Sequence, residues 1–154
     1  MRQFVKTARW TGSHFGKTEI TTKPANYSIF DEDCGEGLHN YIFKLKTECK
    51  KDEEFSYGFK THLTDEQGIM KPYLGYKVTS KTDKLNLKVS FLKSGFKKIP
   101  IEVKLVLYAD HSKGIIYSES ELKVENSSDY YIFKADEIEN PFILYTYAIE
   151  WKYQ

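Results

Sequence analysis

The amino-acid sequence predicts an all-β fold, and three observations support that class. Apolar and polar residues alternate with a period of two in several segments, which is the pattern of strands that bury one face. Turn-forming Gly, Pro, Asn and Ser residues separate these segments at short intervals. No long segment has the 3.6-residue period of an amphipathic helix. We therefore expect a single antiparallel β-sandwich of about eight strands with Greek-key connections, formed by residues 1–154 as one domain.

Each predicted strand is a segment in which side chains of one kind recur at every second position. The last one is the clearest, because Ile143, Tyr145, Tyr147, Ile149 and Trp151 would all lie on one face. In chain order, the candidate segments from which about eight strands would form comprise residues 4–10, 27–30, 41–46, 55–63, 74–79, 85–91, 101–108, 115–124, 130–134 and 143–152.

The residues between the predicted strands indicate how they are connected. Gly35 and Gly37 mark a turn after the second strand. Residues 94–98 have the composition of a hairpin connection, so we expect the strands on either side to pair with each other. Residues 136–139 predict one short helical turn that ends before Pro141.

Composition and charge exclude several classes of protein. The chain has 154 residues with 23 basic and 22 acidic side chains, and this balance is atypical of nucleic-acid-binding proteins. Aromatic residues make up 16% of it, which is too many for a disordered chain. No apolar run is long enough for a transmembrane helix, and no secretory signal begins the sequence. We expect an intracellular protein without a membrane association, in which Cys34 and Cys49 are reduced thiols.

The residue types that carry out catalysis do not form a recognisable motif. The acidic stretch at residues 31–37 lacks the ligand spacing of an EF-hand loop and is expected to be a solvated turn. The histidines, at positions 14, 39, 62 and 111, are dispersed and show no zinc-site spacing. The sequence therefore predicts neither an enzyme, nor a metal site, nor a cofactor.

Four segments are notable for their order along the chain: residues 10–15, Phe30 with the acidic turn and strand that follow it, residues 131–134, and residues 141–149. They resemble, in the same order, conserved segments of MATH domains, the TRAF-like family of eight-stranded β-sandwiches. Tyr131 and Ile132 stand where that family has Trp and Gly. The resemblance implies a module without enzymatic activity that binds a partner protein or an extended peptide across a groove on one sheet, as in substrate-recognition domains of ubiquitin-ligase adaptors.

Carried over to this chain, the resemblance implies a peptide-binding groove that contains Tyr131, Phe133 and, from an earlier strand, Phe59. Such rings would form apolar pockets, while the backbone of a strand edge would supply hydrogen bonds. The alternative interpretation is that Phe133 belongs to the core and Tyr131 is a half-exposed ring. Two other functions remain open: a carbohydrate-binding, lectin-like sandwich, and a pathogen-encoded sandwich that binds a host protein. The oligomeric state is also open, because the edge strands of a sandwich can pair between chains.

Overall fold

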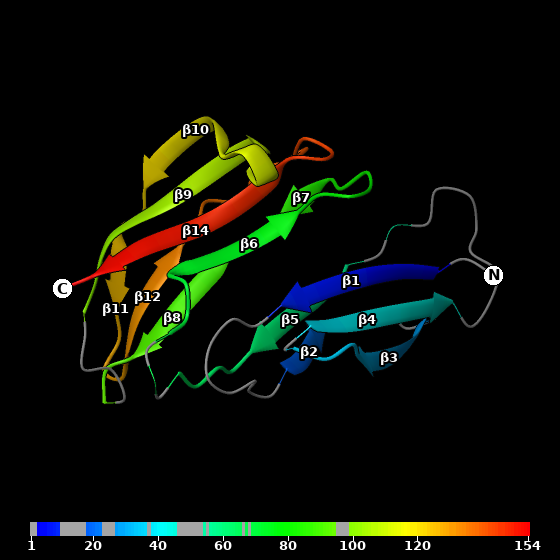
Figure 1. Ribbon diagram of the computed structural model, residues 1–154, viewed down its shortest axis with the longest axis horizontal. Helices are drawn as coiled ribbons and strands as arrows, with labels where there is room; N and C mark the ends of the chain where they lie inside the picture. Colours follow the sequence, from blue (N-terminus) through cyan, green and yellow to red (C-terminus); the bar gives the residue numbers. More distant parts are fainter. Residues whose placement is uncertain are drawn as a thin grey trace. The chain divides into compact units, whose positions relative to one another are not determined.

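The computed structural model describes residues 3–9, 18–22, 27–36, 38–45, 54, 56–65, 67, 69–94 and 99–154 (Figure 1). These residues are almost entirely β-structure in antiparallel sheets, which confirms the predicted class. They fall into two compact units, Met1–Lys71 and Pro72–Gln154, and each described ladder lies within one unit. A single eight-stranded sandwich over residues 1–154 therefore stays a prediction. The described part of the chain contains no helix that is both long enough and apolar enough to cross a membrane.

The first unit contains two antiparallel sheets. Its three-stranded sheet has the order β1-β4-β3, and its two-stranded sheet pairs β2 with β5. These strands are β1 (Gln3–Arg9), β2 (Thr18–Thr22), β3 (Tyr27–Asp33), β4 (Leu38–Leu45) and β5 (Gly58–Thr61). Alternation on β4 places Tyr41 and Phe43 on one face, and both side chains are buried.

The second unit contains a four-stranded sheet of order β10-β9-β14-β6 and a three-stranded sheet of order β11-β12-β8. A short ladder pairs β7 with β13. The elements are β6 (Tyr73–Lys77), β7 (Lys84–Leu85), β8 (Lys88–Leu92), β9 (Pro100–Asp110), η1 (His111–Lys113), β10 (Ile115–Glu121), β11 (Val124–Asn126), β12 (Tyr130–Lys134), β13 (Ile138–Glu139) and β14 (Thr146–Tyr153).

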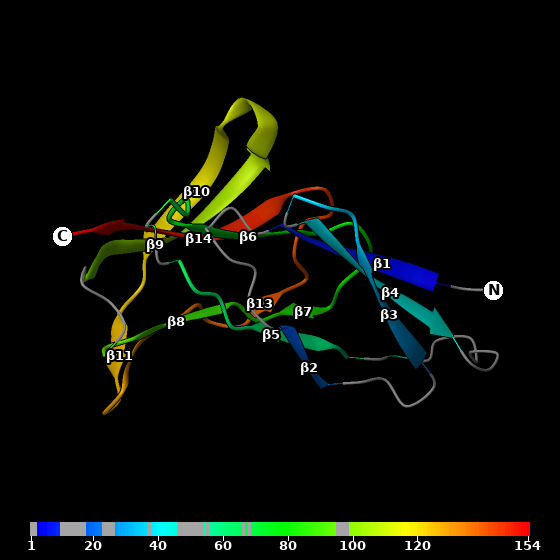
Figure 2. The ribbon, with the colours of Figure 1, turned by 60° about the horizontal axis from the view of Figure 1, so that its bottom comes forward.

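The core of the second unit lies between its sheets, which form two layers in Figure 2. The ring of Phe91 on β8 is 5.1 Å from that of Trp151 on β14, so the two sheets meet there through aromatic edges. Elsewhere in the core, Val78, Leu107 and Tyr147 form a buried cluster against which Leu85, Leu87 and Ile138 pack. The alternation that predicted the last strand thus places Tyr147, Ile149 and Trp151 in the interior.

Three predictions, about a hairpin, a helical turn and the start of the last strand, are wrong. The strands flanking residues 94–98 do not form a hairpin, because β8 pairs with β12 and β9 pairs with β10 and β14. Residues 138–139 are extended and pair with β7 instead of forming a helical turn. The last strand begins at Thr146, because Leu144 has a left-handed φ of 71° and its N–H bonds to the carbonyl of Val78, which bends the chain away from the sheet direction.

Candidate functional site

Two of the rings predicted to bind a peptide, Tyr131 and Phe133, lie on β12 and share one face of it. Phe133 is only 6% exposed, and its ring is 6.1 Å from that of Phe91 in the core. Tyr131 is half-buried, and the Lys93 ammonium lies 4.9 Å from its ring centre. This placement fits the alternative interpretation, in which Phe133 is a core residue.

The third predicted ring, Phe59, lies on β5 in the first unit. It is half-buried and is surrounded by other rings, those of Tyr41 at 5.1 Å, Phe43 at 5.5 Å and Tyr57 at 5.7 Å. Such an aromatic cluster stabilises the packing of β5 against β4. A peptide-binding role for Tyr131, Phe133 and Phe59 remains a prediction.

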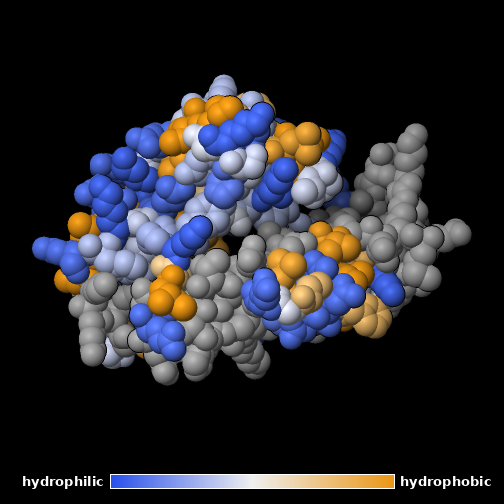
Figure 3. All heavy atoms as spheres, viewed as in Figure 1, coloured by the Kyte–Doolittle hydropathy of each residue, from blue (hydrophilic) through white to orange (hydrophobic). Residues whose placement is uncertain are grey.

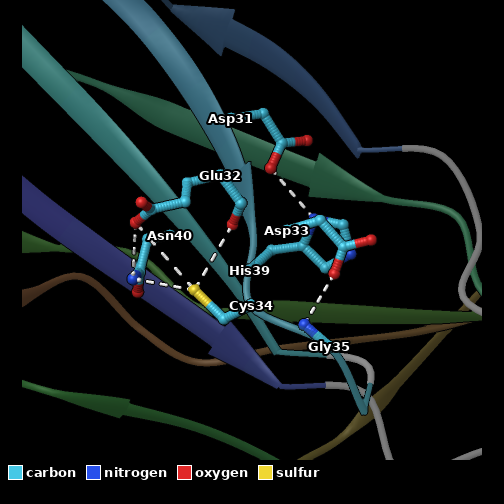
Figure 4. A network of polar contacts seen from close by, with 7 residues as sticks. All are labelled: Asp31, Glu32, Asp33, Cys34, Gly35, His39 and Asn40. Atoms are coloured by element: carbon cyan, nitrogen blue, oxygen red, sulfur yellow. Dashed lines mark hydrogen bonds and ion pairs between the residues drawn. The ribbon is translucent and has the colours of Figure 1, made fainter.

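The acidic stretch singled out in the sequence forms the β3–β4 hairpin (Figure 4). Asp31 accepts a 2.9 Å contact from His39 Nδ1, and Asn40 Nδ2 donates to both Glu32 and the Cys34 sulfur. Partial desolvation and the carboxylates of Glu32 and Asp33 raise the pKa of the Cys34 thiol. A raised pKa reduces the thiolate fraction, so these surroundings do not activate Cys34 as a nucleophile.

No group of three or more His, Cys, Asp and Glu side chains that could hold a metal ion occurs in the part of the chain that the structure describes. The polar side chains of the β3–β4 hairpin bond to one another instead, in a solvated turn.

Exposed apolar side chains gather at one end of the second unit, on β10 and on the loop before β14 (Figure 3). We call this set the apolar patch; it consists of Ile115, Ile116, Tyr117, Phe142, Ile143 and Leu144. Tyr117 is 62% exposed and Phe142 50%, and their rings lie 5.9 Å apart. Both rings also contact Tyr145, at 5.8 and 5.2 Å. A cluster of exposed rings of this kind is typical of interaction sites.

The loop that carries half of the apolar patch is held by hydrogen bonds at both ends. Phe142 N–H donates to the Tyr147 hydroxyl at 2.9 Å, and Leu144 N–H donates to the Val78 carbonyl at 2.6 Å. Val78 N–H in turn donates to the Tyr145 carbonyl at 3.0 Å. The loop therefore has a defined conformation while its side chains remain exposed, and a preordered surface loses less conformational entropy on binding.

The other half of the apolar patch begins at the β9–β10 turn, which is also fixed. Asp110 caps η1 by accepting from Ser112 N–H and Oγ, at 3.1 and 2.6 Å, and these bonds lower the pKa of Asp110. His111 stacks on Tyr73 at 5.0 Å and meets the edge of Tyr108 at 4.9 Å. These contacts fasten the turn to the outer face of the four-stranded sheet.

The outer face of this sheet is itself well packed near the turn. The Tyr108 hydroxyl donates a 2.5 Å hydrogen bond to Glu150, and this bond raises the pKa of Tyr108 to about 12. The Tyr73 ring lies so close over Gly75 that a Cβ added at position 75 would overlap the ring and displace it. β9, β14 and β6 thus form a well-packed base from which β10 extends.

β10 differs from the other strands of its sheet because all seven of its residues are exposed. Strands of a sandwich ordinarily bury alternate residues, whereas here both faces are open to solvent. Figure 2 shows β10 and the end of β9 standing away from β7, β8 and β13 of the same unit. In the described residues, β10 pairs with β9 alone, so its other edge is open.

The sequence contains a signal for the apolar patch, although alternation alone assigns these residues to strands. Consecutive apolar residues at 115–117 and 142–145 cannot all face one core, because neighbouring strand residues point to opposite sides. Alternation identifies which residues share a face, but it does not show whether a second layer covers that face. Whether a second layer covers a face becomes known only from the order of the strands in the sheets.

Comparison of the chain with models of protein families, with curated proteins and with solved structures gave no match. The assignment of a function therefore depends on the geometry of the chain itself. Within that geometry, the apolar patch and the open edge of β10 are two features that packing in the described unit leaves unexplained.

Proposed function

We propose that this chain is a protein-interaction module and that the apolar patch is its binding surface. The observation that carries the proposal is the exposed ring cluster of Tyr117 and Phe142 over Tyr145, presented by a loop with a fixed backbone. Large exposed rings on an ordered support are the groups that contribute most to protein interfaces.

Backbone strain in the same loop supports the proposal. Leu144 is 63% exposed and has a φ of 71°, a conformation that L-residues other than Asn and Asp rarely adopt. An apolar side chain that is both strained and exposed contributes little to folding. Such strain is found preferentially at binding sites. The resemblance to MATH domains implies the same class of function, a module that recognises a partner protein or peptide.

Our first prediction is that Tyr117→Ala combined with Phe142→Ala weakens the binding of a specific partner at least tenfold, which is a loss of about 1.4 kcal/mol. A partner would be captured on the immobilised chain, identified by mass spectrometry, purified and titrated by calorimetry. The far-UV circular dichroism spectrum should remain that of β-structure, because both side chains are half or more exposed.

The matched control is Tyr130→Ala, which removes an exposed ring of β12 outside the apolar patch and should leave the affinity unchanged. Undiminished binding by the Tyr117/Phe142 double variant would contradict the proposal. Loss of binding in Tyr131→Ala and Phe59→Ala instead would support the groove predicted from the sequence.

A further inference from the structure

The outer edge of β10 is a row of backbone N–H and C=O groups next to the apolar patch. An unpaired edge of this kind is a template for another strand, and proteins usually cover or shorten it. In the described residues of this unit the edge is uncovered, and β10 is also exposed on both faces. An added strand would therefore meet no described element of the unit as an obstacle.

The two faces of β10 differ in chemistry, as its register with β9 shows. Glu119 lies opposite Val106 and Glu121 opposite Lys104, so both glutamates are on the face of the sheet that carries Tyr108 and Glu150. Lys104 forms an ion pair with Glu119 at 3.2 Å. Among these described residues, one lysine thus faces three glutamates near β10, which leaves this face negatively charged.

The opposite face of β10 carries Ser118 and Ser120, with the ring of Tyr117 near the beginning of the strand. Ser118 lies opposite Leu107, a core residue, so this face is continuous with the interior of the unit. Tyr117 lies at a register shift between Ile116 and Ser118, and its ring reaches Phe142 and Tyr145. A strand beside β10 would place alternate side chains on this face, where the nearest of them would lie beside Tyr117.

From this arrangement we infer that the partner adds an extended strand to the outer edge of β10, with apolar and basic side chains in alternation. Its apolar side chains would lie beside Tyr117, next to Phe142, and its basic side chains would lie beside Glu119 and Glu121. Ladder hydrogen bonds contribute affinity in such strand addition, and the alternating side chains contribute specificity. This inference rests on the proposed function and specifies the partner's chemistry.

Charge disfavours a second copy of this chain as the occupant. In a ladder between two copies of β10, Glu119 and Glu121 of each copy would join the same acidic face. Like charges on neighbouring strands destabilise a ladder. A partner with basic residues on that face would instead form opposite-charge pairs.

The test uses the full chain and synthetic peptides whose binding is measured by fluorescence anisotropy. The probe is the capped, dye-labelled peptide Val-Lys-Val-Lys-Val-Lys-Val, and its control has the same composition with all lysines placed first. Two further peptides are N-methylated at alternate residues, one blocking each edge, because successive backbone N–H groups point to opposite edges of a strand. We expect the alternating peptide to bind at least tenfold more tightly than the control and than one of the methylated peptides.

The protein side of the test is a charge reversal on β10. Glu121→Lys should weaken binding of the lysine peptide at least fivefold and improve binding of a peptide with Glu at the lysine positions. Glu125→Lys reverses a charge on β11, in the other sheet, and should change neither affinity. Both glutamates are exposed, so we expect both variants to fold, as circular dichroism would verify.

Three results would overturn the inference. Equal binding of the alternating, control and both methylated peptides would show that no ladder forms. A complete absence of peptide binding would do the same. A dimer in analytical ultracentrifugation that Glu121→Lys strengthens would identify a second copy as the occupant. None of these results bears on the proposed function, which has its own test. The proposed function fails only if the Tyr117/Phe142 double variant still binds the captured partner.

Discussion

Leu144 illustrates at the scale of one residue how the proposed binding surface can conflict with stability. The residue has a φ of 71°, while its N–H is fixed to the Val78 carbonyl. The left-handed region costs an L-residue roughly 1–2 kcal/mol, and glycine does not bear that cost. The side chain is mostly exposed, so packing does not offset the strain.

We therefore predict that Leu144→Gly raises the free energy of unfolding by about 1 kcal/mol while it weakens partner binding. Urea denaturation monitored by circular dichroism would measure the first effect, and calorimetry the second. Ile143→Gly is the matched control, because Ile143 is similarly exposed in the same loop but lacks a left-handed φ. Glycine at position 143 should lower stability by increasing the entropy of the unfolded chain. Equal destabilisation by both variants would contradict the role of strain.

At the scale of elements, the four-stranded sheet has a buried centre and an exposed edge. β14 pairs with both β9 and β6, and Ala148 and Ile149 are fully buried. β10 pairs with β9 alone among the described strands and buries none of its residues. Buried side chains are thus concentrated on β9 and β14, whereas those of β10 are exposed to solvent.

Truncating an isoleucine on each strand tests this contrast. Ile149→Ala should lower the free energy of unfolding by about 2–5 kcal/mol, because it leaves a cavity in a closed core. Ile115→Ala should change it by no more than about 0.5 kcal/mol, because half of that side chain is already in water. Urea denaturation of both variants would measure the two changes in the free energy of unfolding. A similar loss from Ile115→Ala would mean that β10 is covered in solution.

The elements also show how far sequence reasoning reaches. Alternation identified β9 and β14 because each keeps its pattern over many residues. It wrongly joined β7 to β8 in one strand at 85–91 and β10 to β11 in one strand at 115–124, although each pair is divided between two sheets. It missed β2, where Thr18–Thr22 contains only one apolar residue, Ile20. It also misassigned the connection at 94–98, because a turn signal does not reveal whether the next strand joins the same sheet.

The limits of alternation also explain what could be predicted of the candidate site. The sequence indicated a surplus of rings and a binding role for a few of them. It selected Phe133, which the structure places in the core, and it assigned Tyr145 and its neighbours to a strand. Exposure depends on which strand lies at the edge of which sheet, and this ordering is set by contacts distant in sequence.

At the scale of the whole molecule, the described ladders divide at Lys71. Strands β6 to β14 pair only among themselves in the described residues, and the contacts of Val78, Leu107 and Tyr147 with their neighbours lie within residues 72–154. This unit therefore contains both sheets that enclose a core. A set of elements that buries its own apolar faces is the physical criterion for an independent domain.

We accordingly predict that residues 72–154, expressed alone, fold into a cooperative domain that retains the apolar patch. Dispersed amide resonances in a nitrogen–proton correlation spectrum and a single urea transition would demonstrate folding. Ile149→Ala provides a control in the same fragment, because it should abolish or sharply weaken the transition if the core at β14 is intact. The fragment should also bind the alternating peptide with the affinity of the full chain, because every residue of the patch and of β10 lies within it. A fragment that is unfolded, while the full chain unfolds in one transition, would contradict the division at Lys71. It would favour the single domain over residues 1–154 that the sequence predicts.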